Sequence, residues 1–152
     1  MAEPLHVGGV NIEPVDYRAL SDDQIRLLNV FENVIREDAA PEDPERPIDL
    51  TEAEVRTLPE HFVVHEFWGL DGDGGLAAQA FASWMNTEDN RHAAHVGLEV
   101  RPDLRRRGIG KALLGLLVDV IAADGRSLII GTSTTRAPAG GAFAERVGAE
   151  LG

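Results

Sequence analysis

The stretch from His95 to Leu117, HVGLEVRPDLRRRGIGKALLGLL, is the feature that most limits how this chain can fold. It begins with the alternating pattern of a strand, continues through a turn rich in Arg and Gly, and ends in the start of a long helix. From Ile109 the apolar residues recur at offsets of 0, 3, 4, 7, 8, 11 and 12, one face of a helix that Asp124 and Gly125 end. Because Arg126–Thr132 has the pattern of a further strand, the sequence predicts a parallel strand–helix–strand unit.

The segments before this unit predict an α/β fold of the α+β type, a mixed and mostly antiparallel sheet flanked by helices. Two capping boxes, Ser21-x-x-Gln24 and Thr51-x-x-Glu54, predict the starts of two helices. Strands are expected over Gly9–Val15 at an edge of the sheet, His61–Leu70, Leu76–Met85 and Arg91–Val100, and a last helix over Pro138–Val147. On the strand at His61–Leu70 the alternating polar residues, Glu66 among them, are expected to face water.

Composition narrows the possible functions. The 152 residues are enough for one domain with a real core, and a formal net charge of −12 argues against a general nucleic-acid binder. There is no Cys, no metal-ligand cluster in the sequence, and no apolar run long enough to cross a membrane. The first residues, MAEPLHVGGV, lack the pattern of a signal peptide, so we expect a cytoplasmic protein with no metal and no membrane partner.

The Arg/Gly turn has the chemistry of an anion site. Gly108 and Gly110 let the backbone approach a ligand closely, and the first amides of the following helix have no acceptor within the helix. Such amides and the positive end of the helix dipole favour a diphosphate. Basic residues gather around it in an otherwise acidic chain: Arg101, Arg105, Arg106, Arg107 and Lys111. Two other interpretations of this turn remain. It could pack tightly and leave its arginines solvated, or it could bind the diphosphate of a nucleotide other than the one that the motif below suggests.

The motif Leu98-x-Val100-x-Pro102-x-x-Arg105-x-x-Gly108-x-Gly110 resembles the acetyl-CoA-binding motif of the GNAT superfamily of N-acetyltransferases, and the order of elements resembles that family's layout. The resemblance implies acetyl-CoA as co-substrate, with backbone groups of Leu98 and Val100 bonding the pantetheine arm. The residues that it assigns to cofactor binding are Leu98, Glu99, Val100, Arg105, Arg106, Arg107, Gly108, Ile109, Gly110 and Lys111.

The family's reaction is direct attack of an amine on the thioester, which needs a base. At the positions where the family often has a base or an acidic Tyr, this sequence has Ala94, Val96 and Ala144. The sequence therefore does not identify the catalytic residues. One candidate is His92 at the strand entrance, whose alternative is a turn histidine. The others are His95 and Glu99, which alternate to the face opposite Val96 and Leu98 and whose alternative is a satisfied or exposed polar residue.

The expected acceptor is a primary amine on a small molecule or peptide. Ser83 and Trp84 are candidates to line the acceptor pocket, although Trp84 is expected in the core. An acidic rim could attract the amine; its residues are Glu37, Asp38, Glu42, Asp43 and Glu45. Asn90-Arg91-His92 resembles a branch with two such domains in tandem. We expect residues 1–152 to form a single domain that is truncated at its C-terminal end, lacks the family's last two strands, and has a second GNAT domain or a homodimer partner. The alternative function is a degenerate, non-catalytic half of a tandem acetyltransferase.

Overall fold

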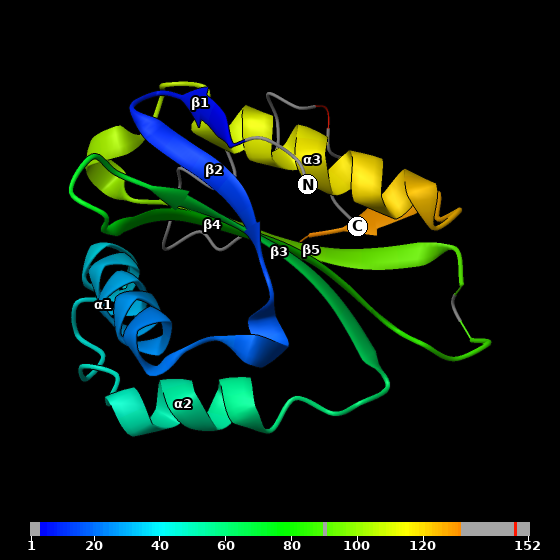
Figure 1. Cartoon of the computed structure of the whole chain (residues 1–152), viewed down its shortest axis with the longest axis horizontal. Helices are drawn as coiled ribbons and strands as arrows, with labels where there is room; N and C mark the ends of the chain where they lie inside the picture. Colours follow the sequence, from blue (N-terminus) through cyan, green and yellow to red (C-terminus); the bar gives the residue numbers. More distant parts are fainter. Residues whose placement is uncertain (1–3, 90, 132–147, 149–152) are drawn as a thin grey trace.

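The computed structural model of the chain describes residues 4–89, 91–131 and 148, and it places one curled sheet between helices (Figure 1). Neighbouring strands are antiparallel except β5 and β6, which are parallel, as predicted. The strands follow the order β1 (Leu5–Val7), β2 (Val10–Val15), β3 (Phe62–Leu70), β4 (Leu76–Met85), β5 (Ala93–Val100) and β6 (Leu128–Ile130). The predicted α/β fold with a mostly antiparallel sheet is therefore confirmed.

Helix α3 (Ile109–Ala123) crosses one face of the sheet, which we call the α3 face (Figure 1). Its predicted apolar stripe is buried: Ile109, Leu113, Leu117 and Ile121 are at most 2% exposed. The sheet meets this stripe mainly with small side chains, since Ala78, Ala80, Ala82 and Ala94 are all fully buried against it. Small residues allow a helix to approach a sheet closely.

Helices α1 (Asp22–Ala39) and α2 (Ile48–Arg56) cover the other face, which we call the α1 face (Figure 1). A second core lies beneath them, in which Leu28, Phe31, Val55 and Trp68 are buried. Short 3-10 helices precede α1 (η1, Tyr17–Ala19) and follow β5 (η2, Pro102–Leu104). The predicted capping box at Ser21 is confirmed, because Ser21 and Gln24 each accept a hydrogen bond from the other's backbone N–H.

The second predicted capping box is wrong. Helix α2 begins at Ile48 after Pro47, so Thr51 lies inside the helix. The Thr51 hydroxyl is buried and donates a hydrogen bond of 2.6 Å to Glu32 on α1. It also accepts one of 3.1 Å from Asn29. Tertiary contacts between the two helices, rather than capping, therefore explain a Thr at this position.

The prediction of an edge strand at Gly9–Val15 is also wrong in one respect. β2 covers Val10–Val15, but β1 pairs with it and forms the edge instead. Gly8 and Gly9 connect the two strands with φ of 58° and 88°, a conformation that favours glycine. The predicted last helix at 138–147 lies outside the described residues, and β6 is shorter than the predicted strand at 126–132.

Replacing Gly8 with Ala should destabilise the fold by roughly 2–4 kcal/mol, from left-handed backbone strain and from overpacking. A Cβ at Gly8 would lie 2.7 Å from Cγ1 of Ile109 and 2.9 Å from Cβ of Arg107. Gly74→Ala is the matched control, because Gly74 has φ of 82° but open space around it. Urea unfolding of both variants measures the difference. Equal losses would show that the β1–β2 turn does not pack against the turn before α3.

Candidate functional site

The described part of the sheet opens along one side of β5. β6 pairs with Ala93, Ala94 and His95, and no described strand follows Val96–Val100 on that side. The N–H of Arg101 donates to the carbonyl of Ala77 on β4, so in this antiparallel pair the odd-numbered residues of β5 bond to β4. The backbone groups of Val96, Leu98 and Val100 therefore point into the opening. Leu98 and Val100, the two residues predicted to bond a pantetheine arm, are among them, and the Val100 carbonyl already accepts a hydrogen bond from Arg105.

Helix α3 begins after the turn that follows β5, beside the β1–β2 turn. Its N-cap is Gly108, with φ of 84°, and within the described part of the chain no side chain caps this end of the helix. The first bond within the helix is from Ala112 to Gly108, so the amides of Ile109, Gly110 and Lys111 have no acceptor inside it. The first turn contains no acidic residue. These features fit a bound anion, because the dipole and the amides act in the same direction.

The predicted basic residues have different roles in the structure. Arg106 has φ of 66°, the one positive φ of a non-glycine residue in the described chain. Arg105 donates to the carbonyl of Val100 and, at 2.9 Å, to Asp38 on α1. Arg107 and Lys111 form no ion pair with any described carboxylate. Their charges therefore remain available beside the turn, whereas the Arg105 guanidinium links β5 to α1.

Arg101 belongs to the scaffold. Its guanidinium donates to Asp71 at 2.8 Å and to Asp103 at 2.7 Å. These hydrogen bonds raise the pKa of Arg101 and lower the pKa of both carboxyl groups. The contact ties the β3–β4 turn to the end of β5, so Arg101 holds the opening in place and is not free for a ligand.

The candidate catalytic residues of β5 are not brought together. Glu99 lies on the α1 face, opposite Gln79 of β4, whereas Leu98 packs into the core on the α3 face. His95 is exposed on the same face as Glu99, about 13 Å further along the strand. The exposed His92 precedes the strand, and its carbonyl accepts hydrogen bonds from Ser127 and Leu128. Glu99 and His95 are therefore too far apart to act on one atom.

Glu66 on β3 is the residue that the sequence analysis placed incorrectly. It is 3% exposed, so it does not face water. Its carboxylate accepts 2.8 Å and 3.1 Å hydrogen bonds from Gln79 Nε2 and Trp68 Nε1. Burial raises the pKa of Glu66 to about 7, against the lowering effect of these two bonds, and the charge of Glu32 raises it further. The protein therefore holds a carboxyl group that changes protonation near neutral pH.

Further acidic groups surround Glu66 on the α1 face. Burial raises the pKa of Glu32 on α1, which lies near both Glu66 and Glu99. Although Glu99 as a residue is exposed, desolvation of its carboxyl group raises its pKa, and Glu32 adds to this while Arg105 opposes it. Tyr17 has a pKa raised to about 12 by burial and then by Glu66. This face therefore favours a positively charged group.

Phe81 lies on β4, between Glu66 on β3 and Gly97 on β5. Glu66 pairs with Phe81, and Phe81 pairs with Gly97, so the three residues form one row across β3, β4 and β5. The Phe81 ring lies over Gly97 so closely that a Cβ at position 97 would clash with it. Ser83, the other pocket candidate, is partly buried in the same strand, and Trp84 is in the core as expected.

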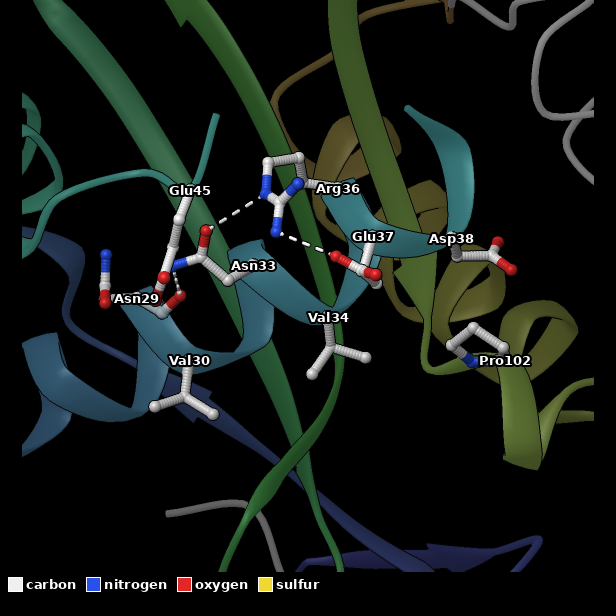
Figure 2. Close-up of a pocket in the computed structure, with 9 residues that line it drawn as sticks. All are labelled: Asn29, Val30, Asn33, Val34, Arg36, Glu37, Asp38, Glu45 and Pro102. Carbon is white, nitrogen blue, oxygen red and sulfur yellow. Dashed lines mark hydrogen bonds and ion pairs between the residues drawn. The ribbon is translucent and has the colours of Figure 1, made fainter. Parts of the chain in front are cut away.

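An open hollow of about 720 Å³ lies between α1 and Pro102, at the end of β5 (Figure 2). Val30 and Val34 form its apolar part, and Val30 is 62% exposed. Three members of the predicted acidic rim line it as well, namely Glu37, Asp38 and Glu45. The rim therefore borders a real hollow, next to the residue pair that joins α1 to the turn.

Among the residues that the structure describes, no three His, Asp or Glu side chains come together as a metal site. Within the same residues no helix has both the length and the apolar content of a bilayer-spanning segment.

Comparison with known proteins agrees with this geometry. The sequence profile of the Acetyltransferase (GNAT) family matches residues 28–149, which include every element from α2 to β6 and most of α1. The chain belongs to the GNAT acetyltransferase family. A comparison with curated protein sequences gives no match. The opening along β5 and the N-terminus of α3 both lie within the matched residues of this GNAT domain.

Solved structures share the fold at low sequence identity. A tandem GNAT protein from the clavulanic acid biosynthesis pathway matches with a TM-score of 0.73 and 20% identity, over 91% of this chain and 43% of that one. A phosphinothricin acetyltransferase from Sinorhizobium meliloti, in complex with AcCoA, matches with a TM-score of 0.70 and 22% identity, over 95% of this chain and 76% of that one. An aminoglycoside acetyltransferase from an uncultured soil metagenomic sample, in complex with sisomicin, matches with a TM-score of 0.66 and 17% identity, over 95% of this chain and 91% of that one. The GNAT domain thus spans less than half of the tandem protein.

Proposed function

We propose that this GNAT domain binds acetyl-CoA and transfers its acetyl group to a primary amine. The observation that carries the proposal is the N-terminus of α3, where Gly108 offers no side-chain cap and, among the described residues, the first three amides have no acceptor within the helix. The amides and the free charges of Arg107 and Lys111 would hold the diphosphate. Backbone groups of Leu98 and Val100 would bond the pantetheine arm.

The proposed acceptor is a small-molecule or peptide amine that carries a positive charge. The hollow beside α1 is lined by Glu37, Asp38 and Glu45, and the neighbouring α1 face holds Glu32 and further carboxyl groups. Carboxylates of one sign along an approach path attract a cationic ligand and raise its local concentration. Valine side chains in the same hollow would contact the apolar part of the acceptor.

The chemistry needs three contributions from the protein. When bound, acetyl-CoA supplies the activated acetyl group. The chain must orient the thioester carbonyl, which N–H groups along β5 can polarise, and it must place the amine against it. It must also accept a proton from the ammonium, because the protonated amine has no lone pair with which to attack.

Isothermal titration with acetyl-CoA tests the first half of the proposal, and turnover of three amines tests the second: sisomicin, phosphinothricin and a lysine-containing peptide. We expect binding in the micromolar range and release of free CoA with at least one amine. Absence of binding at millimolar acetyl-CoA would reject the proposal. Binding of inorganic diphosphate without acetyl-CoA would point to another nucleotide ligand.

A second candidate function is a non-catalytic, CoA-binding half of a tandem acetyltransferase. The observation in its favour is that Ala94 and Val96 leave β5 without a base where the family often has one. The similarity to a tandem protein of which this chain spans 43% also suits it. Tight binding of acetyl-CoA with no turnover of any amine would favour this second function.

A further inference from the structure

We propose that Glu66 takes the proton from the acceptor ammonium, directly or through one water molecule. This inference rests on the proposed function and assigns a residue on β3, a strand that none of the predicted catalytic residues occupies. The step is balanced: the ammonium N–H bond breaks, the proton joins the Glu66 carboxylate, and the freed nitrogen lone pair forms the C–N bond as the C–S bond breaks. The second proton of the nitrogen leaves with the thiolate, and Glu66 returns its proton to solvent.

The position of Glu66 in the sheet is the first argument. Glu66, Phe81 and Gly97 form one row across three strands. Gly97 lies two residues beyond His95, the last β5 residue that pairs with β6, and so at the start of the opening. Two strand spacings of about 4.8 Å place Glu66 about 10 Å from Gly97 between Cα atoms. The Glu66 carboxylate is held jointly by Trp68 of its own strand and by Gln79 of β4, the strand that lies between β3 and β5.

The hydrogen bonds of Glu66 are the second argument. Each carboxylate oxygen accepts one hydrogen bond, from Gln79 to Oε1 and from Trp68 to Oε2. A carboxylate oxygen has two lone pairs, so both oxygens keep acceptor capacity for a proton. When Glu66 is protonated, the Gln79 amide can rotate and offer its carbonyl oxygen. The site therefore accommodates both protonation states without an unpaired buried group.

The surrounding charges are the third argument. The titratable groups that face Glu66 are Glu32 on α1 and Tyr17 on η1. Arg46, the nearest cation to Glu32, is shared between Glu32 at 3.6 Å and Glu54 at 2.6 Å. Glu66 has no cation of its own among the described residues, so the ammonium of an acceptor would be its natural counter-charge. Burial and Glu32 keep its pKa at about 7, close to the value that suits a base at neutral pH.

The test compares two measurements on the same protein. In the wild type, kcat/KM for the best acceptor of the panel should rise tenfold per pH unit up to about pH 7, because kcat/KM reports the free enzyme. The indole N–H of Trp68 bonds directly to Glu66, so its NMR resonance should titrate with the same midpoint. Trp84→Phe identifies which of the two indole signals belongs to Trp68.

Glu66→Gln should lower kcat about 10²- to 10⁴-fold, leave the KM for acetyl-CoA unchanged, and remove both the pH 7 limb and the Trp68 titration. Glu60→Gln is the matched control, because Glu60 is an exposed carboxylate just before the same strand. This control should change neither the pH 7 limb nor the Trp68 titration. Glu66→Asp, which keeps the carboxylate, should retain the limb at a lower kcat. It also covers the case in which Glu66→Gln fails to fold.

Three results would overturn the inference. One is a pH 7 limb that survives Glu66→Gln or disappears in Glu99→Gln instead. Another is a Trp68 midpoint that differs from the kinetic one by more than about half a pH unit. The third is binding of acetyl-CoA with no turnover at any pH, which would leave the cofactor half of the proposed function standing. Absence of acetyl-CoA binding would overturn both.

Discussion

Replacing Gly110 with Asp should lower the affinity for acetyl-CoA at least about a hundredfold and leave the fold intact. Gly110 is the second residue of α3, within the turn whose amides have no acceptor. An Asp carboxylate there would place a negative charge next to the bound diphosphate. Like charges about 4 Å apart repel by about 4 kcal/mol near a protein surface, and 1.4 kcal/mol already corresponds to a tenfold change in affinity.

The same substitution should not destabilise the protein. An acidic residue in the first turn stabilises a helix by roughly 0.3–1 kcal/mol, because it complements the dipole, and α3 has none. Binding and stability should therefore change in opposite directions, which a merely damaged turn could not produce. Isothermal titration and thermal unfolding of one preparation measure the two effects.

Gly115→Asp is the control for the Gly110 variant. Gly115 lies on the same helix and is exposed, and a Cβ added there would have open space around it. The control adds the same charge away from the first turn, so acetyl-CoA should bind as tightly as to the wild type. If Gly110→Asp binds acetyl-CoA normally, the diphosphate does not lie at the N-terminus of α3.

The part of the fold nearest to this turn could be predicted from the sequence, because its signals are local and agree with one another. The apolar stripe of α3 has helical spacing over four turns, and Gly125 ends it. The box at Ser21 forms because both of its partners lie within one turn of helix. The parallel pairing of β5 and β6 follows from a strand, a helix and a strand in succession.

The predictions that failed depended on contacts between distant residues. Thr51 had the spacing of a cap, yet Glu32, nineteen residues earlier, binds its hydroxyl. The strand β1 was missed although Gly8-Gly9 between two short apolar runs is a hairpin signal. In both cases the local pattern allowed two structures, and tertiary packing selected one of them.

Glu66 could not have been placed from its own strand. Alternation shows which residues share a face, but helices cover both faces of this sheet, so a polar residue is not directed to water by parity alone. A signal did exist on the next strand. Gln79 interrupts the apolar run Leu76–Ala82, and a half-buried amide in such a run favours a polar partner, which the structure shows to be Glu66.

Glu66→Gln should stabilise the folded protein by about 3 kcal/mol at pH 8, and by nothing at pH 4. The pKa of Glu66 is raised from 4.5 to about 7 in the folded state. One pKa unit corresponds to about 1.4 kcal/mol, so holding this group ionised at pH 8 costs about that much for each unit by which its pKa is raised. The neutral Gln avoids this cost and can still accept from Trp68 while donating to a rotated Gln79 amide.

The direction of the pH dependence follows from proton binding. Between pH 4.5 and 7 the folded wild type holds a proton on Glu66 that the unfolded chain has lost, so its stability falls as pH rises through this window. The variant has no such window, and the gap between the two melting temperatures should open from pH 4.5 to pH 7. At about 2–4 °C per kcal/mol for a chain of this size, the gap should reach roughly 6–12 °C.

Glu60→Gln again provides the comparison, since an exposed carboxylate just before the same strand should give no gap at any pH. A Glu66→Gln variant that melts below the wild type at pH 8 would mean that the ionised carboxylate is stabilised where it lies, which contradicts a raised pKa. A strained or destabilised active site commonly gains stability when a functional group is removed, and loses activity at the same time. Gain of stability together with loss of turnover in this one variant would therefore link the burial of Glu66 to its role as proton acceptor.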